Sequence, residues 1–345
     1  MNINKKPLFN ENGDIEVSKK RMINGNTTNL NDFNNMKYGW VSEWYRQAMN
    51  NFWIPEEINL AQDLKDYNKL EEAEKTAYDK ILSFLIFLDS IQTANLGNIN
   101  NYITASEINL CLTIQAFQEA VHSQSYSYML DTICSPEKRN EILYQWKDDE
   151  VLLERNKFIG AQYNSFLEEP TVENLVKAVM ANYILEGIYF YSGFMFFYNL
   201  ERNGKMPGSA QEIRYINRDE NTHLWLFRSI IRELMKEEPE VFTEELKEEL
   251  RQMMKIGVEN EINWGKYVIG DESGFLPCTP YGIIQLLEEY NINVEGKDTV
   301  VIGRSNIVGK PISLLMTAKS ATVKICHKKT KKMFEKIEKA DIIIS

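Results

Sequence analysis

Apolar residues recur with the spacing of an α-helix over most of the chain, from about Met36 to Asp271. Glycine and proline in this part stand mostly between the periodic stretches, where helices would end. ILSFLIFLDSIQ (81–92) and MANYILEGIYFYSGFMFFYNL (180–200) are apolar around most of the helix, so we expect them at the centre of a bundle. The main helices are predicted at residues 70–96, 104–133, 136–166, 171–203, 209–236 and 240–270.

Start signals of known kinds precede three of these helices. A Ser or Thr followed three residues later by Glu has the spacing of a capping box. A Ser followed by Pro is typical of an N-cap with a first-turn proline. The pairs are Thr104 with Glu107, Ser209 with Glu212, and Ser135 with Pro136.

The pattern changes after SGFLPCTPYG (273–282). From there the short β-branched runs TVVIG (299–303), ATVKIC (321–326) and ADIII (340–344) alternate with helix-like segments, which indicates an α/β structure. The first 273 residues carry 28 Lys+Arg and 43 Asp+Glu, whereas the rest of the chain carries 11 and 7. We therefore predict three parts, an N-terminal arm (1–36), a helical domain (37–272) and a partial α/β segment (273–345).

Composition narrows the classes of function. The net charge of −11 and the lack of a basic stripe disfavour a nucleic-acid partner. No apolar segment of signal-peptide type or membrane-spanning length occurs, so we predict a cytoplasmic protein without a membrane partner. The four cysteines lack CxxC or metal-site spacing, and we expect free thiols in a reducing compartment. They are Cys111, Cys134, Cys278 and Cys326.

Two pairs of acid and imidazole residues have the same spacing on different predicted helices. Glu119 and His122 lie in FQEAVHSQSY, and Glu220 and His223 lie in RDENTH. Residues three apart project from one face of a helix, so each pair can offer an oxygen and a nitrogen to one metal ion. A single such pair is often a surface acid beside a histidine, but two pairs on separate helices indicate a dimetal-carboxylate bundle.

Such a bundle also needs one carboxylate from each of two further helices. Asp89 and Glu186 are lone acids in the two most apolar helices, and neither apolar stretch contains a Lys or Arg to pair with them. Burial of an ionised carboxylate without a cation is very costly. Four carboxylates and two imidazoles favour a pair of Fe or Mn ions over Zn, without distinguishing iron from manganese.

Four segments together resemble the radical-generating small subunit of class I ribonucleotide reductase. They are LDSIQ (88–92), EAVHSQSY (119–126), LEGIYFY (185–191) and RDENTH (218–223), and the resemblance extends over about 37–271. It implies a mainly α, ferritin-like helical bundle that forms a homodimer and holds two Fe or two Mn ions per chain. The implied metal ligands are Asp89, Glu119, His122, Glu186, Glu220 and His223.

The same resemblance implies how an oxidising equivalent is stored. Tyr126 matches the tyrosine that becomes a stable radical, and Phe190 and Phe194 match the apolar pocket around it. Without the ligands, Tyr126 would be read as an ordinary buried tyrosine. Gln115 stands where some relatives have a tryptophan, and we infer no loss of function from it.

The resemblance also implies a partner. Trp53, in NFWIPEE, together with Asp219 and His122 is the implied start of an electron path to the large catalytic subunit, although Trp53 also suits plain packing. That subunit would use the stored equivalent to reduce ribonucleotides to deoxyribonucleotides. Nucleotide binding would belong to the partner, because nothing in the helical part resembles a phosphate-binding loop.

The C-terminal segment resembles another family. GFLPCTPYGIIQLLEEY (274–290) and GRSNIVGKP (303–311) are similar to the bifunctional methylenetetrahydrofolate dehydrogenase/cyclohydrolase. A strand entering a glycine turn directs backbone amides at a phosphate, so the resemblance implies an NADP loop. The substrate-binding half of that family, with its catalytic residues, is absent, and we expect no dehydrogenase activity. The implied loop residues are Gly303, Arg304 and Ser305.

This segment also stands where the small-subunit family has a flexible acidic tail that docks into the large subunit. We therefore expect weakened docking, whether the segment arose by fusion, truncation or mis-assembly. Three other functions stay open: a dimetal oxidase acting directly on a small substrate, a metal store, and an active NADP-binding tail.

Overall fold

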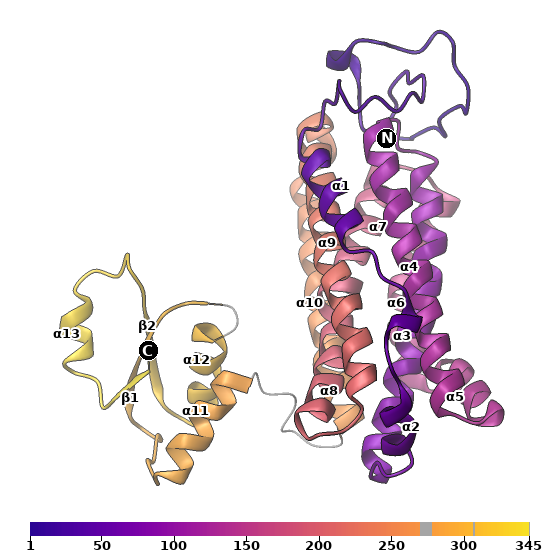
Figure 1. Ribbon diagram of the computed structural model, residues 1–345. Helices are drawn as coiled ribbons and strands as arrows, with labels where there is room; N and C mark the ends of the chain where they lie inside the picture. The colour runs from indigo at the N-terminus through magenta and orange to yellow at the C-terminus, as the bar shows by residue number, and fades with distance from the viewer. Residues whose placement is uncertain (270–277, 306–307, 345) are drawn as a thin grey trace. The chain divides into compact units, whose positions relative to one another are not determined.

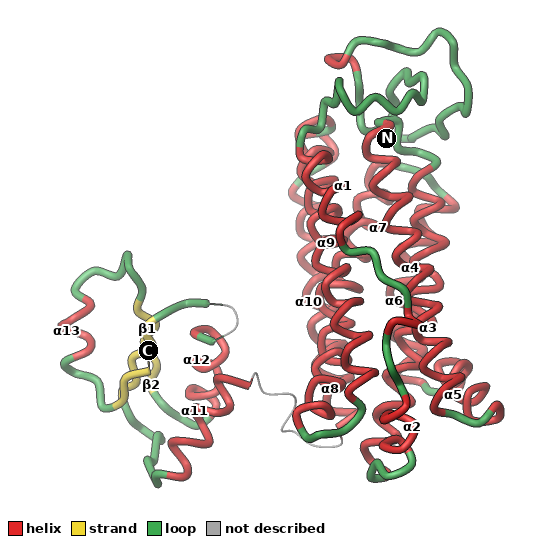
Figure 2. Tube along the Cα trace, viewed as in Figure 1, coloured by secondary structure: helices red, strands yellow, loops and turns green. Residues whose placement is uncertain are grey.

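The computed structural model describes residues 1–269, 278–305 and 308–344. They fall into two compact units, Met1–Glu272 and Ser273–Ser345, each considered by itself. The first unit is helical, and the second combines a small sheet with helices (Figure 1; Figure 2). The predicted boundary between 272 and 273 lies outside the described residues.

The first unit contains every helix that the apolar spacing predicts, so the mainly α fold is confirmed. Two short helices before residue 70 precede them. No described helix is long and apolar enough to cross a membrane. The helices are α1 (Trp40–Asn50), α2 (Ala61–Tyr67), α3 (Glu72–Asn100), α4 (Ser106–Ile133), α5 (Pro136–Asp148), α6 (Glu150–Glu168), α7 (Val172–Ile184), η3 (Leu185–Tyr189), α8 (Phe190–Arg202), α9 (Pro207–Glu237) and α10 (Glu244–Ile269), with 3-10 turns η1 (Val17–Lys19), η2 (Pro55–Glu57) and η4 (Pro239–Val241).

Two of the predicted helices are interrupted. The helix expected at 136–166 is two helices, because Asp149 leaves the helical conformation and its side chain accepts from the first amides of α6. The helix expected at 171–203 contains the π-helical segment η3 between α7 and α8. Such segments are frequent at functional sites, and this one carries Glu186.

One of the three predicted start signals is confirmed. Ser135 caps α5 by accepting from the amide of Lys138. The Ser209 prediction is wrong, because α9 begins two residues earlier at Pro207. Ser209 instead donates its hydroxyl to Asp63 in α2, so a contact between helices takes the place of a cap.

The prediction for Thr104 and Glu107 is also wrong, because both residues bind the N-terminal arm. Thr104 donates to the carbonyl of Arg21, and Glu107 accepts from the Lys20 side chain at 3.4 Å as well as from the amide of Lys37, the first residue after the arm. The arm runs over one end of the bundle (Figure 1), where Ile23 is fully buried and bridges to Ile103. Side chains with the spacing of a cap therefore hold the arm in place.

The second unit has a three-stranded parallel sheet in the order β2-β1-β3. Val301 of β1 packs with Ile312 and Met316 of the following helix in a small apolar core. Ile325 and Ile343 on the two outer strands are 42% and 50% exposed, so the outer strands are only partly covered. The elements are α11 (Cys278–Glu289), β1 (Asp298–Ile302), α12 (Gly309–Ala318), β2 (Thr322–Cys326), α13 (Met333–Ile337) and β3 (Ile342–Ile344).

Candidate metal centre

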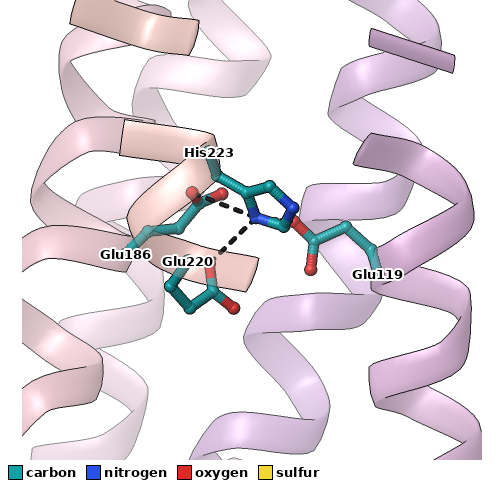
Figure 3. A group of neighbouring side chains, drawn as sticks. All are labelled: Glu119, Glu186, Glu220 and His223. Atoms are coloured by element: carbon teal, nitrogen blue, oxygen red, sulfur yellow. Dashed lines mark hydrogen bonds and ion pairs between the residues drawn. The ribbon is translucent and has the colours of Figure 1, made fainter. Parts of the chain in front are cut away.

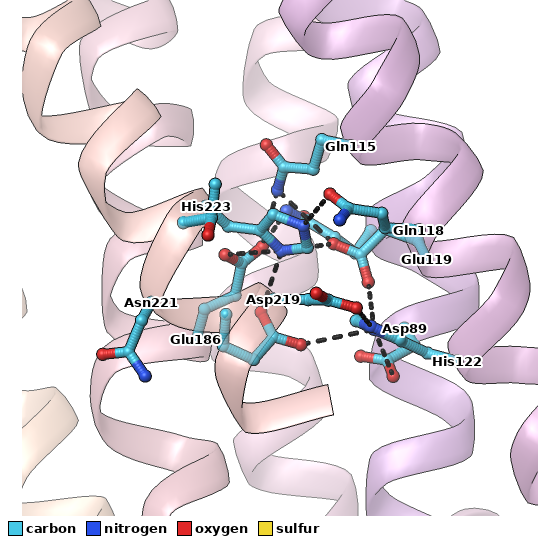
Figure 4. Close-up of polar contacts among 12 residues, drawn as sticks. Asp89, Gln115, Gln118, Glu119, His122, Glu186, Asp219, Asn221 and His223 are labelled. Atoms are coloured by element: carbon cyan, nitrogen blue, oxygen red, sulfur yellow. Dashed lines mark hydrogen bonds and ion pairs between the residues drawn. The ribbon is translucent and has the colours of Figure 1, made fainter. Parts of the chain in front are cut away.

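Six acidic and imidazole side chains from four segments of the first unit meet in the centre of the bundle (Figure 3; Figure 4). All six are fully buried. They form two groups that share Glu119, and within each group one ligand atom of every residue lies within 4.8 Å of the others. The residues are Asp89 of α3, Glu119 and His122 of α4, Glu186 of η3, and Glu220 and His223 of α9.

The two imidazoles face the same carboxylates. His122 Nδ1 lies 3.2 Å from Glu119 Oε2 and 3.4 Å from Glu220 Oε1. His223 Nδ1 lies 3.3 Å from Glu119 Oε1 and 3.0 Å from Glu220 Oε2. Because one oxygen of each acid is directed at each histidine, these two carboxylates would each help to hold two ions.

The outer nitrogen of each imidazole contacts a neighbour that fixes the ring. His122 Nε2 lies 3.3 Å from Asp219 Oδ2, which also accepts from the indole of Trp53 at 2.9 Å. His223 Nε2 lies 3.0 Å from the side-chain oxygen of Gln118. Partners of this kind orient metal-binding histidines, and the structure joins Trp53, Asp219 and His122 in one hydrogen-bonded row.

Burial controls the charges of the four acids. Burial raises the pKa of Asp89 well above its ordinary value, and repulsion from Glu119 adds to the effect. Burial also raises the pKa of Glu186 to about 7 and that of Glu220 to about 8. Glu119 differs, because the two histidines outweigh its burial and lower its pKa. Without other cations, protons must balance the carboxylates.

The donor set fits a pair of divalent ions. Both oxygens of Asp89, Oε2 of Glu186 and Oε1 of Glu220 are buried without a hydrogen bond of normal geometry. Imidazole nitrogens lie 3.9, 3.5 and 3.4 Å from Asp89 Oδ2, Glu186 Oε2 and Glu220 Oε1. A buried polar atom without a partner is costly, so these oxygens suit cation ligation. Two divalent ions would neutralise the four carboxylates, and oxygen donors with imidazole nitrogens suit Fe or Mn.

Tyr126 lies on α4 one turn beyond His122 and is fully buried. Its hydroxyl lies next to the Asp89 carboxyl. Burial, followed by the charge of Asp89, raises its pKa well above the ordinary value. Phe190 and Phe194 on α8 are also fully buried, with ring centroids 5.8 Å apart.

Neutral amides surround the acids, and most of them were missed by reasoning from the sequence. Gln115 donates to Glu186 Oε1 at 3.0 Å and to Glu119 Oε1 at 3.4 Å, and Gln92 donates to the same Glu186 oxygen at 2.6 Å. The available signal was spacing, because Gln92 follows Asp89 by three residues and Gln115 precedes Glu119 by four.

The three residues predicted to form an NADP loop follow strand β1 in the second unit. Gly303 has a φ of +132° after strand β1, a conformation that favours glycine, and its amide donates to the carbonyl of Cys326. The Ser305 hydroxyl accepts from the amides of Val308 and Gly309 at 3.1 Å each. Ser305 thus already binds two amides near the start of α12, and Arg304 is exposed. The next two loop residues, Asn306 and Ile307, lie outside the described residues.

Comparison with known proteins matches the two parts of the chain to two families. Residues 30–284 match the family "Ribonucleotide reductase, small chain". A ribonucleoside-diphosphate reductase subunit beta from Treponema pallidum is 75% identical over 270 residues, which are 78% of this chain and 77% of that protein. The solved R2 subunit from Clostridium botulinum is 56% identical with a TM-score of 0.76, covering 79% of this chain and 85% of that one.

The C-terminal part matches a separate family. Residues 277–345 match the tetrahydrofolate dehydrogenase/cyclohydrolase NAD(P)-binding domain. A bifunctional protein FolD from Agathobacter rectalis is 59% identical over 80 residues. The match covers 23% of this chain and 28% of that protein, so only a small part of the relative is represented.

Proposed function

The chain belongs to the ribonucleotide reductase small-chain family, and we propose that it uses two Fe or two Mn ions to generate and store a radical on Tyr126. It is a ribonucleoside-diphosphate reductase subunit beta, an oxidoreductase that works with a large subunit. The observation that carries the proposal is the meeting of six buried ligands from four helical segments beside that tyrosine.

The six ligands and Tyr126 have separate tasks in this proposal. When bound, the reduced metal ions supply the electrons that activate oxygen. Glu119 and Glu220 hold the ions as a pair, since each carboxylate reaches both histidines. Tyr126 would give one electron and its hydroxyl proton to the oxygen that is being reduced. Full burial then shields the phenoxyl from water and reductants.

Trp53, Asp219 and His122 form the proposed route by which the oxidising equivalent leaves the site. The support is the hydrogen bond from the Trp53 indole to Asp219 and the contact of Asp219 with His122. Asp219 orients both rings through these two contacts. The route ends at the large subunit, where the ribonucleotide is reduced.

The proposal extends to assembly and to the second unit. We propose that the first unit forms a homodimer in the cytoplasm, as the resemblance implies. Residues 277–345 would have no dehydrogenase activity alone, because the matched part is only 28% of the relative's length.

The test is electron paramagnetic resonance of metal-loaded protein after exposure to oxygen. The unaltered chain should bind two ions and give a tyrosyl signal. Tyr126→Phe should bind two ions and consume oxygen without that signal, because only the oxidisable hydroxyl is removed. Tyr102→Phe is the control, since Tyr102 is also buried but lies outside the metal centre. Two bound ions with no tyrosyl signal in the unaltered chain would favour a dimetal oxidase acting directly on a substrate.

A further inference from the structure

The ligands of the metal centre have no direct access to solvent, because all six side chains are fully buried. An ion must therefore pass through the bundle to reach them. A groove of about 440 Å³ lies between α3 and α6 and is open to solvent. Phe87 of α3 and Trp146 of α5 stack at its edge with ring centroids 3.7 Å apart. We call it the α3–α6 groove.

The wall of the α3–α6 groove contains buried amides that lack partners. Asn156 is 4% exposed, and neither polar atom of its side chain has a hydrogen bond. Asn95 is 5% exposed and donates to Asn182 at 3.2 Å, yet its own oxygen is unpaired. Proteins rarely leave such atoms without a partner, so the positions suit water or a passing ion.

Polar groups continue from the groove to a ligand. Tyr163, which lines the groove, donates its hydroxyl to the side-chain oxygen of Gln92 at 2.7 Å. Gln92 donates in turn to Glu186 Oε1 at 2.6 Å. The other oxygen, Glu186 Oε2, is buried and lies 3.5 Å from His223 Nδ1, among the remaining ligands. Glu186 is therefore the metal ligand to which the polar lining of the groove leads.

We propose that divalent Fe or Mn enters the centre through the α3–α6 groove, passing Asn156 and Asn95 before Glu186 receives it. The inference rests on the proposed dimetal function and adds the route of loading. Amide and carboxylate oxygens are suitable ligands for these ions, so the ion exchanges water for protein oxygens in steps. No covalent bond forms or breaks, and the ion keeps its oxidation state.

A second pocket near the metal centre is too apolar to serve as the entry route for a metal ion. It has a volume of about 350 Å³ and is lined largely by apolar side chains, among them Phe52, Phe117 and Val121. Passage of a hydrated dication through an apolar opening carries a large desolvation cost. The α3–α6 groove has side-chain oxygens of Asn95 and Asn156 along its wall, so it suits a dication better than the apolar pocket does.

Gly160 provides a way to narrow the groove without disturbing the bundle. It lines the groove on α6, and a Cβ added there would meet no atom within 4 Å. Glycine is also unfavourable inside a helix, so Gly160→Phe should fold. Gly97→Phe is the matched control, because Gly97 is an exposed glycine of α3 with equally free space and is not part of the groove lining.

The experiment measures the rate of Mn(II) uptake by the full-length apo protein. Uptake is monitored by the loss of the electron paramagnetic resonance signal of free Mn(II). Gly160→Phe should slow uptake by at least about tenfold, equivalent to roughly 1.4 kcal/mol in the barrier, while Gly97→Phe keeps the normal rate. Asn156→Leu should slow uptake too, and should raise the melting temperature because it removes an unpaired amide. All three variants should finally bind two ions per chain.

Uptake at the normal rate by both groove variants would overturn the entry route, whereas slow uptake only in those two supports it. The final ion count separately tests the dimetal site. Fewer than two ions in the unaltered chain would contradict the proposed function itself, together with the route that depends on it.

Discussion

Glu212 of α9 is expected to make the stability of the first unit fall as pH rises. Its carboxyl is fully buried. Burial, with the nearby charges of Asp63 and Glu56 adding to it, raises its pKa from 4.5 to about 9, and Ser125 opposes the shift only in part. The folded chain therefore keeps a proton on Glu212 at neutral pH.

The size and sign of the effect follow from the two pKa values. Between pH 4.5 and about 9 the unfolded chain has lost this proton and the folded chain retains it, so stability falls with rising pH. In this range each pH unit lowers the free energy of unfolding by about 1.4 kcal/mol. The loss from this group is thus about 3 kcal/mol at pH 7, on an order-of-magnitude scale, and continues to grow up to about pH 9.

The assay is urea unfolding of the apo protein, followed by helical circular dichroism at unit steps from pH 5 to pH 9. The glutamine of Glu212→Gln has nearly the same shape as glutamate and does not titrate. The free energy of unfolding of this variant should therefore exceed that of the unaltered chain by a larger amount at each higher pH. Glu245→Gln makes the same change at an exposed position of α10 and should leave the pH profile parallel to the unaltered one. Parallel profiles for Glu212→Gln as well would show that the buried carboxyl does not titrate as described.

Three further substitutions test the site and its support. His122→Ala should leave at most one ion per chain by elemental analysis, because the remaining acids repel one another; two ions would contradict its assignment as a ligand. Arg155→Met should lower the free energy of urea unfolding by about 3–5 kcal/mol, because it leaves Glu261, its partner at 2.6 Å, without a cation in a buried setting; an unchanged midpoint would refute that role. Trp53→Phe should bind two ions and give the Tyr126 signal but stop nucleotide reduction with a large subunit; normal turnover would exclude Trp53 from the electron path.

The acids of the centre could be predicted because their local sequence is improbable without a cation. Asp89 and Glu186 each interrupt an apolar stretch, and the structure brings both to the two Glu-x-x-His pairs. The helices were predictable for a similar reason, since apolar spacing persists over many turns. Long-range regularity and the energetic cost of burial are both visible in a single chain.

Features that depend on distant partners could not be predicted. Thr104 and Glu107 have the spacing of a capping box, yet the N-terminal arm, more than 60 residues earlier, binds both of them through Arg21 and Lys20. The π-helical segment at Leu185–Tyr189 has no local sign either, since its residues suit an ordinary helix. Arg155 donates to the carbonyl of Tyr189 and pairs with Glu261 of α10, so contacts from other helices hold this segment.

The choice of amides around the centre reflects a constraint on charge. Gln92, Gln115 and Gln118 hold Glu186, Glu119 and His223 by neutral hydrogen bonds. Among the residues that the structure describes, no Lys or Arg forms an ion pair with any of the six ligands, although a lysine could also donate to a carboxylate. A lysine there would neutralise an acid and compete with the ion, because buried opposite charges pair strongly. The amides orient the carboxylates yet leave their negative charge for a metal, so exchanging Gln92 for lysine should weaken metal binding even though the hydrogen bond to Glu186 survives.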